Sequence, residues 1–186
     1  PNWNALLAGL DAARQAHLLK LAAGVPGFAG LLNSLNPSSV AQAHLLAILN
    51  ALDSRQMDSL TELLGSMDAA GLAKFSSLLN GSAGAALNAD GLNHLIALLQ
   101  GLPAGTQGPA NFRNLIANLD LVNGIPNLIK LLNHPGNDVN AGILFALQTA
   151  DAAGIENLAA LLNGLTPAGY DRLAGALNSN SDTMHI

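Results

Sequence analysis

Three of the five histidines recur at one position of a repeated pattern, each directly before a leucine-rich run. His17 precedes "LLKL", His44 precedes "LLAI" and His94 precedes "LIAL". A row of imidazoles could form a pH switch or a metal site, because histidine changes charge near neutral pH and ligates metals as the neutral ring. Lys74 and Arg172 stand at the same position in other copies of the pattern. This mixture favours a solvated polar edge over a metal-binding row.

The acidic residues have structural interpretations. Asp90 and His94 could share one helical face, but two ligands make a weak metal site, so the sequence predicts no metal and no cofactor. Asp53, Asp68 and Asp151 each open a copy of the repeat, where a carboxylate caps a helix N-terminus. General acid–base catalysis needs such a group in a shaped, partly buried site, and no cysteine is available for thiolate chemistry. We therefore predict that the protein is not an enzyme.

An amide recurs near the end of the repeat. In armadillo-type solenoids, which this chain resembles only in general character, an asparagine ladder binds an extended peptide backbone. The armadillo unit is about 40 residues long, whereas the period here is about 15. Capping of helix ends is therefore the preferred interpretation. The amides are Asn33, Asn50, Asn80, Gln100, Asn133, Gln148, Asn163 and Asn178.

The repeat that positions these side chains is clearest in "DAAGIENLAALLNGL" at 151–165. Its apolar residues Ile155, Leu158, Leu161, Leu162 and Leu165 fall within an arc of about 120° on a helix of 100° per residue. Each copy therefore predicts one short amphipathic helix. Other copies begin at 11, 38, 53, 68, 88, 108, 136 and 166, with shorter ones at 26–35 and 124–133 and a leading one in "NWNALLAGL".

About twelve short helices therefore fill the chain. A helix of about 11 residues is marginal alone, so each must pack on its neighbours. The expected fold is all-α, either a helical array (solenoid) or a compact multi-helix bundle. Glycine recurs four residues into the repeat, at Gly71, Gly91, Gly154 and Gly169, which predicts close approach of a neighbouring helix at that point.

The repeat runs through the whole chain, so we expect one domain over 1–186. Segments 81–88 and 103–110 interrupt it with Gly, Pro and small residues and are predicted to be loops. A hinge within 81–110 is the alternative interpretation of these interruptions. The polar tail, 179–186, is expected to be frayed.

Composition excludes several classes of protein. Half of the residues are hydrophobic and 10% are charged, with a net charge of −5; soluble domains average about 25% charged residues. Nucleic-acid binding would need a basic stripe, which is absent. Uncharged runs such as 95–112 are interrupted by Pro and Gly, so no transmembrane span is expected. The start at Pro1 is compatible with removal of a leader, and we expect a secreted, extracellular protein.

The high apolar content gives the first functional hypothesis, a binding protein for a lipid, fatty acid or similar apolar molecule. A variant of this hypothesis is a surface-active protein whose helices open at an interface. The alternative is a protein–protein interaction or self-assembling scaffold, which a defined homo-oligomer would favour over ligand binding. The residues predicted to line or rim the ligand site surround the two interruptions. They are Leu92, His94, Leu95, Ile96, Leu99, Phe112, Leu115 and Ile116.

Overall fold

The computed structural model describes residues 2–35, 40–135, 138–166, 169–170 and 172–173. Within these ranges the chain forms eleven helices and one isolated bridge between Ser82 and Ala85. The helices are α1 (Asn2–Ala8), α2 (Ala12–Gly24), α3 (Phe28–Ser34), α4 (Val40–Ala51), α5 (Ser54–Gly65), α6 (Ala69–Asn80), α7 (Ala89–Gln100), α8 (Gln107–Asn118), α9 (Gly124–Leu132), α10 (Asp138–Thr149) and α11 (Ala152–Gly164).

The all-α prediction is confirmed, and each of the eleven helices coincides with a predicted copy of the repeat. Thr166 starts the predicted twelfth copy: its hydroxyl accepts a hydrogen bond from the Gly169 N–H at 3.2 Å. Most of that copy lies outside the described residues, and so does the tail 179–186.

The predicted N-terminal caps are also confirmed. Asp11, Asp53, Asp68, Asn88 and Asp151 have extended backbones, and each side chain accepts from the backbone N–H three residues later. These bonds measure 2.7 to 2.9 Å. A cap of this kind satisfies one of the N–H groups that a helix start leaves without a partner.

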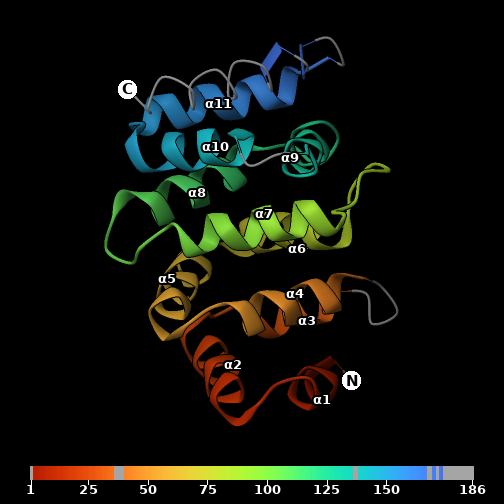
Figure 1. Cartoon of the computed structure of the whole chain (residues 1–186), viewed down its shortest axis with the longest axis vertical. Helices are drawn as coiled ribbons and strands as arrows, with labels where there is room; N and C mark the ends of the chain where they lie inside the picture. Colours follow the sequence, from red (N-terminus) through yellow and green to blue (C-terminus); the bar gives the residue numbers. More distant parts are fainter. Residues whose placement is uncertain (1, 36–39, 136–137, 167–168, 171, 174–186) are drawn as a thin grey trace.

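The helices are arranged in groups of three: α1–α3, α4–α6, α7–α9, and α10 with α11. Each helix packs on its counterpart in the next group, as α2 does on α5, α5 on α8 and α8 on α11. All substantial helix contacts in the described part join helices at most three apart along the chain. The groups follow one another along the long axis of the molecule, from α1 and α2 at one end to α11 at the other (Figure 1). This is the packing of a solenoid, whose unit spans three copies of the sequence repeat.

The recurring amides join successive groups. Six of the eight amides each donate a hydrogen bond to a backbone carbonyl that lies 41 to 49 residues earlier in the chain. The sequence predicted that these amides cap the ends of their own helices, whereas five of them cap the end of a helix in the preceding group and Asn133 binds the connection before α7. The pairs are Asn50 with Gly9, Asn80 with Ser34, Gln100 with Ala51, Asn133 with Ala86, Gln148 with Gly101, and Asn163 with Asn118.

One hydrophobic core runs through all the groups, from Leu6 in α1 to Leu162 in α11. Helix α7 packs on α4 and α5 and also on α9 and α10, so the core continues across segment 81–110. None of the described helices combines the length and the apolar character needed to cross a membrane.

The two predicted interruptions have different outcomes. Segment 81–88 is a loop, with Gly81, Ala83 and Gly84 at positive φ angles of 85°, 46° and 79°. The second loop is shorter than predicted, because α8 already begins at Gln107. Pro109 is tolerated there because the N–H groups of a first helical turn have no intrahelical partner.

Candidate functional site

The predicted ligand-lining residues lie mainly within the packed core. Leu95 and Leu99 of α7 and Phe112, Leu115 and Ile116 of α8 are buried, with at most 3% exposed surface. Leu92 and Ile96 are half-buried and pack against the same core. Leu99 borders a narrow crevice beside Leu60 and Leu102, which has no room for a water molecule. A role of these residues in ligand binding remains a prediction.

His94 and His44 have a structural role that the sequence did not predict. The His94 Nδ1 lies 2.6 Å from the Leu132 carbonyl oxygen, and the His44 Nδ1 lies 3.1 Å from that of Leu79. Both rings are buried, so the predicted solvated edge is wrong at these two positions. Each ring caps the C-terminal end of the helix two places later, where backbone carbonyls lack intrahelical partners.

Asn111 and Asn127 also cap the C-terminal ends of helices, with side-chain amides in place of imidazole rings. Their Nδ2 atoms donate to the carbonyls of Leu147 and Leu162 at 2.9 and 2.8 Å. The histidines therefore belong to a set of helix-capping polar residues. The Asp90 side chain is exposed whereas the His94 ring is buried, and no group of three His, Asp or Glu side chains suited to a metal occurs in the described ranges.

Asn133 and Asn163 form two equivalent clamps, the first on the segment that leads into α7 and the second on the segment between α8 and α9. The Asn133 amide donates to the Ala86 carbonyl at 2.8 Å and accepts from the Asn88 N–H at 3.0 Å. The Asn163 amide donates to Asn118 at 3.0 Å and accepts from Asp120 at 2.9 Å. Each clamp therefore binds the carbonyl of one residue and the N–H of the residue two places later.

Asp120 links the second clamp to α9. Its Oδ1 accepts from the N–H groups of Val122, Asn123 and Gly124 at 2.9, 2.6 and 3.1 Å. The Asn123 N–H makes the largest contribution to lowering the pKa of the Asp120 carboxyl, followed by that of Gly124; Lys74 adds a smaller charge effect. The carboxylate thus fixes the start of α9 and the positions of Val122 and Asn123.

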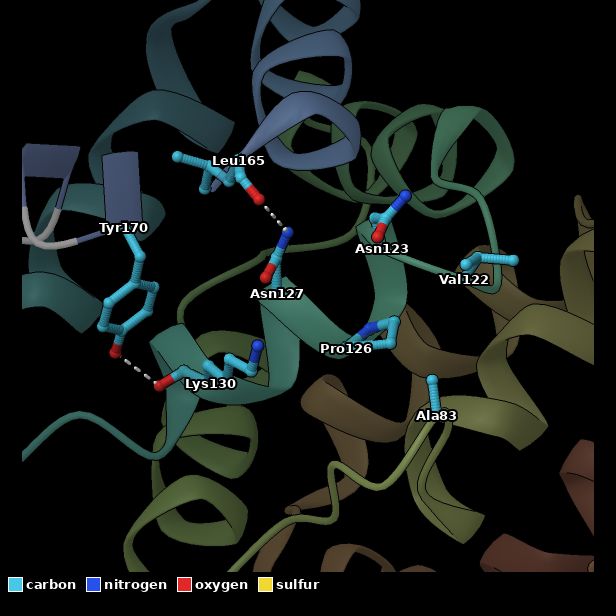
Figure 2. Close-up of a pocket in the computed structure, with 8 residues that line it drawn as sticks. All are labelled: Ala83, Val122, Asn123, Pro126, Asn127, Lys130, Leu165 and Tyr170. Atoms are coloured by element: carbon cyan, nitrogen blue, oxygen red, sulfur yellow. Dashed lines mark hydrogen bonds between the residues drawn. The ribbon is translucent and has the colours of Figure 1, made fainter. Parts of the chain in front are cut away.

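A pocket of about 400 Å³ lies beside α9, and we call it the α9 hollow. It is shown in Figure 2, where side chains from α9 and its preceding turn face Ala83 on one side and Tyr170 and Leu165 on the other. Half of its lining residues are apolar and half are polar. They are Ala83, Val122, Pro126 and Leu165, together with Asn123, Asn127, Lys130 and Tyr170.

Two of the polar residues are held in place by the fold. The Asn127 amide donates to Leu162 and also to Leu165, at 2.8 and 3.4 Å, and the Tyr170 hydroxyl donates to the Lys130 carbonyl at 2.8 Å (Figure 2). The Lys130 side chain is exposed and forms no ion pair or hydrogen bond within the described part of the chain. The side-chain amide of Asn123 is also exposed and forms no hydrogen bond within that part of the chain. The hollow therefore combines a fixed wall with one available cation and one available amide.

A second pocket, the α3–α6 hollow, has a volume of about 260 Å³. Leu31 and Leu72 are among its lining residues, with Gly30 beside open space, since a Cβ there would meet no atom within 4 Å. Its one hydroxyl, on Ser34, already bonds to the Leu31 carbonyl and to Ser76 Oγ at 2.6 and 2.7 Å. Both hollows are thus lined by the third helices of successive groups. The remaining lining residues of this hollow are Gly27, Ala69 and Ala73.

Comparison with protein-family models, with curated proteins and with solved structures gives no match to this chain. The α9 hollow was not predicted from the sequence, because its walls come from three segments between Ala83 and Tyr170. The available signal was Lys130, the only lysine or arginine between Arg113 and Arg172.

Proposed function

We propose that the protein is a non-catalytic scaffold that binds an extended segment of a partner protein along α3, α6 and α9. The observation that supports this most directly is the position of the two hollows, which are both lined by the third helices of the groups. Repeat arrays commonly bind their partners on such extended surfaces.

The spacing of the hollows suits a peptide. Packed helices lie 8–10 Å apart, so about two helix spacings, or roughly 20 Å, separate the α3–α6 hollow from the α9 hollow. An extended chain covers this distance with about six residues at 3.3 Å each. A segment of that length could place one side chain in each hollow.

Exposed apolar side chains beside the α9 hollow support the same proposal. Val122, which lines it, is 71% exposed, and the preceding Leu121 is 45% exposed. Contiguous apolar surface rimmed by polar groups is characteristic of interaction sites. In contrast, the leucines that the sequence assigned to a ligand site fill the space between the helices.

Binding of a small apolar molecule is a second candidate, favoured by the lining of the α3–α6 hollow. Six of its seven lining residues are apolar or glycine, and the Ser34 hydroxyl is already bonded. Its volume of about 260 Å³ lies just below the usual range for ligand pockets, about 300–1,000 Å³. This candidate therefore places a compact ligand at α3 and α6.

The experiment is a selection from a phage-displayed library of random 12-residue peptides on the immobilised full chain. We expect enrichment of a related peptide family whose binding is weakened by Gly30→Leu, which fills the α3–α6 hollow. Ala153→Leu, which adds a leucine at an exposed site on α11, is the matched control and should leave binding unchanged. Failure to enrich any peptide family would contradict the proposal.

The second candidate is tested with the fluorescent probe 1-anilinonaphthalene-8-sulfonate. If the α3–α6 hollow binds apolar molecules, the probe fluoresces with the native protein and loses its signal with Gly30→Leu but not with Ala153→Leu. Equal signals from all three proteins would exclude that hollow as the apolar site. Secretion and homo-oligomerisation remain predictions from the composition.

A further inference from the structure

We propose that the α9 hollow recognises an acidic side chain in the bound segment, through Lys130, next to an apolar side chain that contacts Val122 and Pro126. This inference rests on the proposed function and adds the chemistry of the partner. The occupant is a polypeptide segment with an aspartate or glutamate near an apolar residue.

The charge of the hollow carries the argument. Lys130 is exposed at the edge of the hollow and has no acidic partner within 4 Å among the described residues. Lys20 and Arg14, in contrast, are paired with Asp58 and Asp11. In a chain with a net charge of −5, a cation that has no ion-pair partner among the described residues is complementary to an acidic group on a ligand.

The acid that precedes α9 does not neutralise this cation. The Asp120 carboxylate is held by three backbone N–H groups, and the cation that contributes to its lowered pKa is Lys74. Lys74 itself donates to the Ala117 carbonyl. As far as the described residues go, Lys130 is therefore the cation at the hollow that is available to a ligand.

The apolar half of the site is fixed in place. Pro126 is buried within α9, and the Asp120 hydrogen bonds hold the turn that carries Val122. On the opposite wall, Leu165 is bonded through its carbonyl to Asn127, and Tyr170 is bonded to the Lys130 carbonyl. A preformed wall reduces the ordering cost of binding, and it places the apolar surface beside the Lys130 side chain.

The test repeats the random-peptide selection on three forms of the full chain: native, Lys130→Glu and Arg55→Glu. Arg55 is an exposed cation on α5. The two variants therefore have the same net charge and differ only in the position of the reversed charge, at the α9 hollow or on α5. We expect the native chain and Arg55→Glu to enrich peptides with an acidic residue at a constant distance from an apolar one. The enriched peptide should bind Lys130→Glu about tenfold more weakly, whereas Lys130→Arg should stay within about threefold.

The peptide provides a readout that is independent of folding of the variants. Replacing its acidic residue with the matching amide should weaken binding to the native chain about fivefold and should have no further effect on Lys130→Ala. Enriched peptides without an acidic position, or equal binding to native and Lys130→Glu, would overturn the inference and leave the proposed function standing. Failure of the native chain to enrich any peptide would instead overturn the proposed function.

Discussion

The Asn133 side chain occupies the space that a side chain on Gly91 would need. A Cβ on Gly91 would lie 2.0 Å from Asn133 Oδ1, and the same relationship holds between Gly124 and Asn163 at 2.1 Å. Each glycine thus allows the start of one helix to approach the amide that clamps it. The sequence predicted close approach of a neighbouring helix at Gly71, Gly91, Gly154 and Gly169. Of these four, only Gly91 meets a residue distant in sequence; at the other three the prediction is wrong, because the nearest atoms belong to residues three and four places earlier in the same turn.

The first prediction concerns Gly91. Gly91→Ala should lower the free energy of unfolding by about 1–3 kcal/mol, because the new methyl group displaces the Asn133 amide and breaks its hydrogen bonds to Ala86 and Asn88. Urea denaturation measures the change. Gly30→Ala is the matched control in α3, with no atom within 4 Å of the new Cβ, and should be neutral or stabilising by up to about 1 kcal/mol. Equal stability of both variants would contradict the clamp.

The second prediction tests whether Gly91 and Asn133 act as one unit. Asn133→Ala removes the hydrogen bonds to Ala86 and Asn88 and should cost about 2 kcal/mol. In the double variant Gly91→Ala with Asn133→Ala, the new methyl group no longer meets an amide. The loss of stability in the double variant should therefore be about 1 kcal/mol smaller than the sum of the losses in the two single variants. Strict additivity in urea denaturation would show that the two residues are independent.

The third prediction separates capping by His94 from its packing. His94→Leu keeps an apolar bulk but leaves the Leu132 carbonyl without its donor, and should destabilise the protein by about 1–3 kcal/mol. His94→Asn should recover part of this loss, because Asn127 caps Leu162 in the same way with an amide. Thermal unfolding followed by circular dichroism gives the order of stability. An asparagine variant less stable than the leucine variant would argue against capping.

The fourth prediction is a pH dependence due to Asp120. The pKa of this carboxyl is lowered in the folded chain, chiefly by the Asn123 N–H, so the folded state binds the proton less readily than the unfolded state does. The stabilisation is therefore complete above the ordinary aspartate pKa of about 3.9 and is lost as the pH falls below it. Asp120→Asn should be less stable than the native chain at pH 7, and the difference should shrink towards pH 2.5. Glu156→Gln, an exposed control on α11, should show no such convergence in urea titrations.

The helices could be predicted from the sequence because each carries its own signals. The caps at Asp53 and Asn88 and the apolar stripe of each copy act within one helix, and they locate α5 and α7 without knowledge of the rest. The period of three helices was not visible in the same way. It depends on hydrogen bonds from side-chain amides, such as the one from Asn163 to Asn118. The acceptor in each is a backbone carbonyl, which every residue has, so the sequence does not mark it.

The candidate site was harder to predict for the same reason. His94 was assigned to a polar edge because Lys74 shares its position in the repeat, yet the His94 ring is buried whereas Lys74 is only half-buried. The difference depends on which carbonyl lies opposite each side chain, Leu132 or Ala117. The α9 hollow likewise needs Ala83 and Tyr170 to meet α9, and only tertiary packing brings them together.

The restriction of substantial contacts to helices no more than three apart also governs how the chain loses its structure. No substantial contact joins the helices at one end of the described part to those at the other. Unfolding can therefore start at either end and proceed group by group, as in a one-dimensional lattice with nearest-neighbour coupling. The middle helices α5 to α8 have partners on both sides, and their amide hydrogens should exchange most slowly. The molecule would therefore respond to a stretching force as an extensible chain of linked modules, and one end could yield while the other stays folded.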